Sequence, residues 1–380
     1  MNSPLRHLLS FDLGMVEYED GLLLQKAFSM ARGDRLQRDA LLLLEHSPTI
    51  TLGRSARPEH LLLSRERFAE LGVKVFDVTR GGDVTCHMPG QLVAYPIFRL
   101  SPDRCDVRRY VHDLEEIMLE TLAAFSIRAH RVEGSPGVFL GEPGRNLRKI
   151  GAIGIQMSRW ITSHGLSLNI ANNLDLFRKI VPCGQSQVSV TSMARELRRP
   201  PPFQSVKHIL TQKFAQRFGA HVERGRFSLR TVSVTVLRRA ADDFEVLLLK
   251  RHPNRGDYWQ PITGSIERGE SPSACAVREL REESGQSGHV WNLGYAHAFL
   301  FGEPKPSRLP RVFQETAFWT LVRGDAPIQI DDREHCEHAW MPWKQALDLV
   351  PHAGLRVAII KAVKAARASF ASSEEFFGGV

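Results

Sequence analysis

Hydrophobic and polar residues alternate in short runs through the first 220 residues, and these runs predict both strands and helices. The run ALLLLEHSPTITLG at 40–53 predicts a buried strand followed by a turn, and SHGLSLNI at 163–170 predicts a short strand. Residues 107–125 repeat apolar side chains at helical spacing and predict an amphipathic helix. The pattern therefore favours an α/β (α+β) fold.

The chain is expected to contain two domains, 1–226 and 227–380, because 380 residues exceed the size of a single hydrophobic core. The first domain closes with a predicted helix at 205–218, which follows the proline-rich RRPPPF and ends at a glycine. The apolar face of this helix consists of Val206, Ile209, Leu210, Phe214 and Phe218. A new pattern of two strands, 229–239 and 243–252, then begins.

A helix with clear end signals follows these strands. Ser271 is a good N-cap and Gly285 a good C-cap, with a proline at the first helical position. Glu279, Glu282 and Glu283 share one face of this helix. The expected core-facing residues are Ala276, Val277 and Leu280. Like charges at this spacing destabilise a helix, so a hard divalent cation such as Mg²⁺ or the flanking Arg278 and Arg281 must neutralise them.

The longer segment GSIERGESPSACAVRELREESGQ at 264–286 resembles the Nudix box at every polar position and departs from it only at Gln286, where the family usually has an aliphatic residue. This resemblance covers about 227–370 and implies a Nudix α/β/α sandwich that hydrolyses a diphosphate with Mg²⁺. It implies Glu279, Glu282 and Glu283 as metal ligands, with Glu282 also catalytic, Arg278 orienting them and Glu334 as a further ligand or base. DYWQPITGSIERGES and EHCEHAWMPW are similar to the branch that hydrolyses dihydroneopterin triphosphate and nucleoside triphosphates.

The chain has five scattered cysteines with no CxxC pair, which indicates neither a disulfide framework nor a zinc ribbon. The EHCEH cluster at 334–338 lacks a second pair of zinc ligands. Cys183 is different because it lies between a proline and a glycine in VPCGQ. By itself it is either a small buried hydrophobic residue or a nucleophile on a rigid loop.

Three upstream segments bear on this choice. RGGDVTCHMPGQLVAYPI at 80–97, RKIGAIGIQ at 148–156 and SHGLSLNI at 163–170 occur in this order before the PCG sequence. Together with EHSPTITLGR at 45–54, they resemble the lipoyl(octanoyl) transferases over about 5–220. The resemblance implies a biotin/lipoate ligase-like mixed-sheet domain that needs no cofactor for acyl transfer.

What the resemblance implies for the site is a Cys183 nucleophile whose thiolate is favoured by Lys149. The implied substrate-binding residues are Arg80, Gly81, Gly82, Asp83, Val84, Thr85, Cys86, His87, Ala152, Ile153, Gly154, His164, Gly165, Leu166 and Ser167. The implied partners are octanoyl-acyl carrier protein and the lipoyl domains of 2-oxoacid dehydrogenases and of the glycine cleavage H protein. Cys86 stands where the family often has an aromatic residue and Met88 where it often has glycine, which leaves the acyl-chain preference open.

Two alternatives stay open at this point: an ATP-dependent lipoate or biotin ligase, and a regulator whose Nudix domain senses a metabolite. Segment 195–226 contains eight Lys or Arg and two acidic residues. It is either a solvated face or a docking surface for an acidic carrier protein. The cations that would test the docking surface are Arg198, Arg199 and Lys207. No nucleic-acid partner is expected. With no apolar run of membrane-spanning length and no secretory signal, we expect a cytoplasmic protein without a membrane partner.

Overall fold

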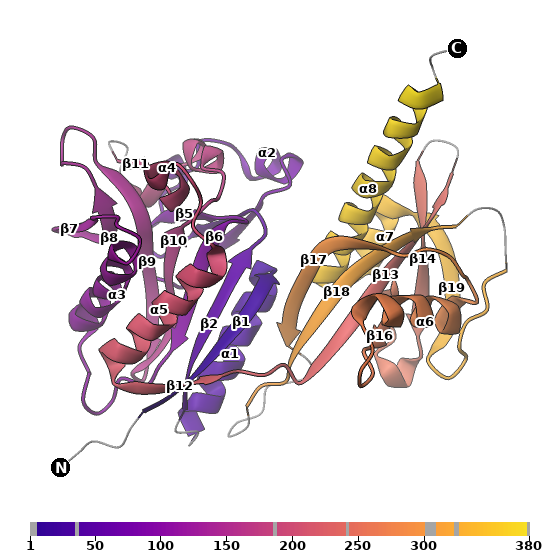
Figure 1. Cartoon of the computed structure of the whole chain (residues 1–380), viewed down its shortest axis with the longest axis horizontal. Coiled ribbons are helices and arrows are strands. Elements are labelled where there is room, and N and C mark those ends of the chain that lie inside the picture. Colours follow the sequence, from indigo (N-terminus) through magenta and orange to yellow (C-terminus); the bar gives the residue numbers. More distant parts are fainter. Residues whose placement is uncertain are drawn as a thin grey trace. The chain divides into compact units, whose positions relative to one another are not determined.

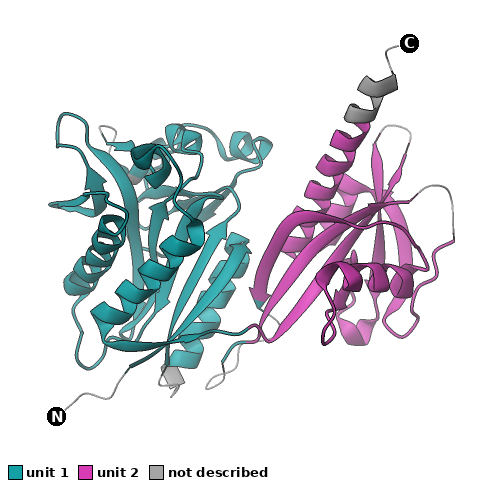
Figure 2. Ribbon diagram, viewed as in Figure 1, with its two compact units in different colours: residues 1–226, 300–310 teal, residues 227–299, 311–380 magenta. Residues whose placement is uncertain are grey.

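The protein is described from a computed structural model that covers residues 6–34, 38–184, 188–240, 243–300, 309–322 and 327–377. It forms two compact units, Met1–Arg226 with Leu300–Pro310, and Phe227–Phe299 with Arg311–Val380 (Figures 1 and 2). None of the helices within the described ranges is both long and apolar enough to cross a membrane.

The first unit is a large mixed sheet with helices on both faces. Its strands are β1 (Arg6–Val16), β2 (Arg38–His46), β3 (Thr49–Leu52), β4 (Lys74–Asp77), β5 (Val84–His87), β6 (Gln91–Ile97), β7 (His130–Val132), β8 (Ser135–Leu140), β9 (Arg148–Ser158), β10 (Ile161–Asn169), β11 (Ser189–Val190) and β12 (Ala220–Arg224). Its helices are α1 (Tyr18–Asp34), α2 (Arg65–Glu70), α3 (Val107–Ala123), α4 (Met193–Leu197) and α5 (Phe203–Phe218), with short 3₁₀ turns η1 (Pro58–His60), η2 (Asp175–Lys179) and η3 (Pro182–Gly184).

The strand order in this unit is β12-β1-β2-β6-β10-β9-β8-β7, with β11 beside β9, and β4-β3-β5 form a separate small sheet. Helices α3 and α5 pack together on one face of the large sheet, and α1 packs against β2, β6 and β10 (Figure 1). Alternation along the strands explains the layers, because Leu41 and Leu43 join the core under α3 and α5, whereas Leu42 and Leu44 are buried on the opposite face.

The helix that closes the first unit forms as predicted. Gly219 ends α5 in the left-handed conformation with φ of 61°, and Val206, Leu210, Phe214 and Phe218 are buried. Three basic side chains of α5 form ion pairs within the first unit. Lys207 Nζ lies 2.7 Å from Asp12 Oδ1, Lys213 Nζ 3.2 Å from Glu120 Oε2, and Arg217 Nη2 3.0 Å from Glu120 Oε1.

The second unit is a sheet between helices. Its strands are β13 (Leu229–Arg239), β14 (Phe244–Arg251), β15 (Trp259–Gln260), β16 (Ile262–Ser265), β17 (Trp291–Leu300), β18 (Val312–Leu321) and β19 (His335–Pro342), its helices are α6 (Pro272–Ser284), α7 (Trp343–Leu349) and α8 (Ala353–Phe377), and η4 (Pro253–Arg255) is a short turn. The order is β15-β14-β13-β18-β17, with β16 on β13 and β19 on β14.

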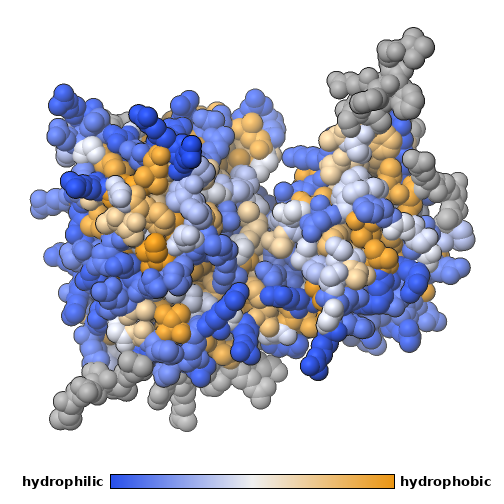
Figure 3. Space-filling model, in the orientation of Figure 1, coloured by the Kyte–Doolittle hydropathy of each residue, from blue (hydrophilic) through white to orange (hydrophobic). Residues whose placement is uncertain are grey.

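One face of this sheet packs against α6 and the other against α7 and α8 (Figure 1). Val232, Val234 and Val236 of β13 lie in the core under α6, whereas Leu237 lies in the core under α8. This is the α/β/α sandwich that the sequence predicts. The visible surface is mainly hydrophilic, with hydrophobic patches on both units (Figure 3).

Candidate active sites

A cavity of about 270 Å³ opens in the first unit between the glycine-rich segment, β5 of the small sheet, and β6, β9 and β10 of the large sheet. Lys149 lines it, as do all the predicted binding residues except Cys86. The predicted residues, which are up to 87 positions apart in the chain from Arg80 to Ser167, therefore meet around one space.

Cys86 is the exception, and the alternation of β5 explains why. Thr85 and His87 face the cavity, whereas Cys86 is fully buried in a core cluster that also contains Ile50 and Met88. Cys86 therefore does not line this cavity, and its contact with the substrate stays a prediction. Met88 does not line the cavity either.

Lys149, on β9, is a buried residue with 6% exposure rather than a solvated lysine at a strand edge. Its ammonium lies 5.0 Å from the centre of the Phe139 ring. A glycine, Gly137, lies beside its side chain, where a Cβ would approach Lys149 Cε to 3.3 Å and the Gly151 carbonyl oxygen to 2.5 Å. Small residues around the lysine thus leave room for its side chain to reach the cavity.

The predicted nucleophile sits on the 3₁₀ turn Pro182–Gly184, although the side chain of Cys183 lies outside the described residues. Gly184 closes the turn with φ of 68°, and its N–H donates to the Val181 carbonyl at 3.1 Å. Directly against the turn, His60 Nδ1 lies 2.7 Å from Asp83 Oδ2. A Cβ on Gly184 would lie 2.7 Å from that same Asp83 oxygen. Because Asp83 lines the cavity, the turn is placed at the cavity wall.

Two buried histidines, His87 and His164, line the cavity, and His46 lies behind them against His87 and Tyr95. All three have lowered pKa values because burial penalises the imidazolium. The pKa of His46 falls to about 3, and those of His87 and His164 fall to about 4. His46 Nε2 lies 2.7 Å from the Tyr95 hydroxyl, and its Nδ1 lies 2.7 Å from the Val16 carbonyl. At neutral pH the cavity is therefore bordered by uncharged imidazoles.

A hydrogen-bond chain fixes the tautomer of His87. Asn169 Nδ2 donates to the Thr191 carbonyl at 3.0 Å, so its Oδ1 accepts from Gln91 Nε2 at 2.9 Å. Gln91 Oε1 must then accept from His87 Nδ1, 2.8 Å away. The direction of these hydrogen bonds is fixed because the last acceptor is a backbone carbonyl, which cannot donate. His87 therefore carries its proton on Nδ1, and Nε2 of the neutral ring has none.

Several residues that line the cavity were not identified from the sequence. Tyr18, Val93, Tyr95, Val111, Gly134, Ser135, Pro136 and Ile155 also line the space. Tyr95 lies inside the RGG segment, and its position two residues after Val93 on one strand is a signal that alternation could have supplied. Tyr18 and Val111 come from helices with no recognisable motif, so only the folded structure brings them here.

In the second unit, α6 begins and ends as predicted, with Ser271 Oγ accepting from the Ala274 N–H and Gly285 left-handed at φ of 66°. Ala276 and Leu280 are buried as expected, but Val277 is 46% exposed. The expectation for Val277 is wrong because the buried stripe of α6 passes through Cys275 and Ala276 instead.

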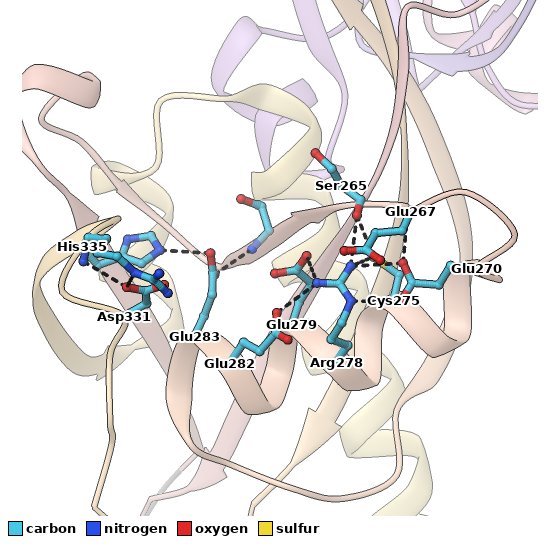
Figure 4. Close-up of polar contacts among 12 residues, drawn as sticks. Ser265, Glu267, Glu270, Cys275, Arg278, Glu279, Glu282, Glu283, Asp331 and His335 are labelled. Atoms are coloured by element: carbon cyan, nitrogen blue, oxygen red, sulfur yellow. Dashed lines mark hydrogen bonds and ion pairs between the residues drawn. The ribbon is translucent and has the colours of Figure 1, made fainter.

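Arg278 holds the acidic residues of α6 in place (Figure 4). Its guanidinium contacts Glu270 at 3.0 Å, Glu279 at 2.7 Å and Glu282 at 3.0 Å. A Cβ at Gly264 would lie 1.8 Å from Glu279 Cδ, so the glycine is what admits this carboxylate. Glu283 points away from Arg278, toward His335 (Figure 4).

The carboxylates of α6 suit a divalent cation. Burial, with added repulsion from Glu283 and Glu282, raises the pKa of Glu279 to about 7 despite its bond to Arg278. Burial also raises the pKa of Glu283. Two carboxyl groups whose ionised forms are this costly need a further positive charge nearby, and carboxylate oxygens are the ligands that Mg²⁺ prefers. Glu334 lies close to Glu283, in a cluster that also includes His335.

Comparison with known proteins follows the same division of the chain. Residues 17–215 match the family described as Lipoyl protein ligase A/B catalytic domain, and residues 229–360 match the NUDIX domain. An octanoyltransferase of Myxococcus xanthus is 44% identical over 353 residues, which are 93% of this chain and 98% of that protein. An octanoyltransferase of Desulfovibrio desulfuricans is 44% identical over 215 residues, 56% of this chain and 87% of that protein.

The dihydroneopterin triphosphate pyrophosphohydrolase of E. coli is similar to the second unit at 22% identity and a TM-score of 0.32, over 35% of this chain and 94% of that one. The Myxococcus relative, by contrast, aligns through both units. This chain belongs to the octanoyltransferase family, with the lipoyl protein ligase A/B catalytic domain in its first half and a Nudix hydrolase domain in its second.

Proposed function

We propose that residues 1–226 transfer an octanoyl group from octanoyl-acyl carrier protein to a lysine of a lipoyl domain through a thioester on Cys183. The observation that carries this proposal is a cavity that is lined by Lys149 and bordered, through Asp83, by the Pro182–Gly184 turn. The acceptors are the lipoyl domains of 2-oxoacid dehydrogenases and of the glycine cleavage H protein.

Lys149 supports each proton movement in this proposal. As an ammonium it favours the Cys183 thiolate, which attacks the thioester carbonyl. The carbon–sulfur bond to the carrier breaks, and the carrier thiolate leaves with the proton of Lys149. The neutral Lys149 amine then takes a proton from the attacking lysine of the lipoyl domain as the amide bond forms and the Cys183 thiolate is released.

The cavity walls suit an acyl chain, since they include the apolar Val93, Ile153 and Leu166 and two histidines that are neutral at pH 7. Because the donor thioester is already activated, this reaction needs no ATP, whereas the ligase alternative does. Incubation with octanoyl-acyl carrier protein alone should therefore give a hydroxylamine-sensitive octanoyl adduct in the intact mass. An adduct undiminished in Cys183→Ser, or one that requires ATP, would overturn the assignment.

We further propose that residues 227–380 hydrolyse a nucleoside- or pterin-linked diphosphate with Mg²⁺. Glu279, Glu282 and Glu283 would hold the ion, which screens the diphosphate and helps to generate the attacking hydroxide. Arg278 fixes the directions of Glu279 and Glu282, and Glu282, the most exposed of the three with 50% of its side chain accessible, is open to an incoming substrate.

A panel of nucleoside and pterin triphosphates assayed with Mg²⁺ tests this second activity. Hydrolysis of one class should be lost in Glu282→Gln and retained in Glu337→Gln, which changes an exposed carboxylate on β19. Binding of a nucleotide without any turnover would favour the regulator instead.

A further inference from the structure

Strand β19 begins with a histidine placed against the acidic helix. His335 is completely buried, and its Nε2 lies 3.1 Å from Glu283 Oε1 (Figure 4). One ligand atom each from Glu283, Glu334 and His335 lie within 4.8 Å of one another. A fully buried imidazole thus faces two carboxylates, one of them in the α6 cluster.

The contact between His335 and Glu283 does not have the geometry of an ordinary hydrogen bond. Neither ring nitrogen of His335 has an aligned hydrogen-bond partner among the described residues, although 3.1 Å is within hydrogen-bond range. The other oxygen of Glu283 accepts from the Thr263 N–H at 3.2 Å, which fixes the carboxylate. Buried polar groups without aligned partners are rare and indicate a missing ligand or ion.

The spacing suits two neighbouring ligands of one metal ion. With metal–ligand bonds of about 2.1 Å, ligands at right angles are about 3.0 Å apart. The 3.1 Å between His335 Nε2 and Glu283 Oε1 matches this distance.

Glu334, the third member of the cluster, is held by two arginine side chains that a metal ion could displace. Glu334 lies 3.6 Å from Arg251 Nη2 and 3.2 Å from Arg255 Nη1, and 38% of its side chain is exposed. Ion pairs this open to solvent contribute little stability, so exchanging them for a metal bond costs little.

We propose that Glu283, Glu334 and His335 form a mixed nitrogen–oxygen site for a divalent first-row transition ion. The proposal rests on the metal-dependent hydrolysis proposed above and adds His335 as a ligand and the class of ion that it selects. An imidazole ligand suits transition ions, whereas Mg²⁺ is bound through oxygen. The second unit should therefore bind Mn²⁺ more tightly than Mg²⁺.

Mn²⁺ titrated into the full-length protein tests the site without reference to turnover. Electron spin-echo modulation of bound Mn²⁺ should show coupling to nitrogen, and the coupling should change to the ¹⁵N pattern in protein labelled with ¹⁵N-histidine. In His335→Gln the coupling should disappear and Mn²⁺ affinity should fall about tenfold or more, with Mg²⁺ affinity within about twofold of the original. His338→Gln, which changes an exposed histidine on the same strand, should alter neither.

Bound Mn²⁺ without nitrogen coupling would overturn the role of His335 and leave metal-dependent hydrolysis intact. Failure to bind either ion would overturn both proposals. If His335→Gln does not fold, the isotope experiment on the unaltered sequence still decides the matter, and Glu334→Gln should weaken Mn²⁺ binding while keeping the nitrogen coupling.

Discussion

Lys149 occupies an environment in which a lysine is costly, since it is buried against Phe139 on a strand that lines the cavity. A strand with alternating small and apolar residues identified its position in the sequence. Its burial could not be read from that pattern, because the residues that lie against it, Gly137 and Phe139, come from a different strand.

Replacing this lysine should slow formation of the acyl-enzyme. Lys149→Met removes the cation proposed to favour the Cys183 thiolate, so acylation should fall about 10²- to 10⁴-fold, the range typical of a lost acid–base group. The test is the rate of octanoyl adduct formation, together with the rate of iodoacetamide alkylation of Cys183 at pH 7. Lys149→Arg keeps the charge and should recover part of the alkylation rate. Equal alkylation rates in Lys149→Met and the unaltered protein would contradict the role.

The buried histidines predict how stability responds to acid. Their pKa values lie at about 3 for His46 and about 4 for His87 and His164, below the ordinary 6.5. Between about pH 6.5 and pH 4 the unfolded chain takes up protons that the folded chain does not. The free energy of unfolding should therefore fall as pH drops through this window, by up to about 1.4 kcal/mol per pH unit for each histidine.

Hydrogen exchange of β5 and β10 measured at pH 7 and pH 5 checks this expectation, after correction for the intrinsic pH dependence of exchange. The free energy of opening measured at the protected amides should be lower at pH 5 than at pH 7. His46→Asn removes one of the proton acceptors and should make the pH dependence shallower, even if it lowers stability overall. Equal stability at pH 7 and pH 5 would show that the pKa values of these histidines are not lowered in the folded protein.

At the scale of elements, the sequence was most informative where local chemistry decides the structure. The ends of α6 and α5 could be predicted because Ser271, Gly285 and Gly219 meet the requirements of helix caps by themselves. The exposure of Val277 could not, because the direction of the buried stripe depends on which residues of the sheet cover the helix. The turn that carries Cys183 was recognisable as PCG, but the His60–Asp83 pair behind it was not, since its members lie on separate segments.

The Pro182–Gly184 turn depends on the absence of a side chain at its last residue. Gly184→Ala would place a Cβ at 2.7 Å from Asp83 Oδ2 in a left-handed backbone conformation, so the turn or the His60–Asp83 pair must shift. Acyl-enzyme formation should drop by about tenfold or more, as expected for a displaced reacting group. The matched control is Gly144→Ala, which also has positive φ but meets no atom within 4 Å. Unchanged transfer in Gly184→Ala would mean that the turn tolerates the displacement.

At the scale of the whole molecule, each half of the chain contains a full set of the groups that its proposed reaction needs. Lys149 and the Pro182–Gly184 turn belong to the first unit, and the carboxylates of α6 with Arg278 belong to the second. Both sets could be found in the sequence because each is concentrated in motifs.

The two reactions should therefore be separable in the full-length protein. Glu282→Gln removes one metal-binding charge and should abolish hydrolysis. The rate of octanoyl transfer should stay within about threefold of the original, a change of less than about 1 kcal/mol in its activation free energy. Cys183→Ser should have the opposite effect, since Cys183 and the cavity that Lys149 lines belong to the first unit. Both activities are measured on the same preparations, with circular dichroism to confirm folding. A loss of octanoyl transfer in folded Glu282→Gln, or on addition of EDTA to the unaltered protein, would show that the Nudix domain acts in the transfer reaction itself.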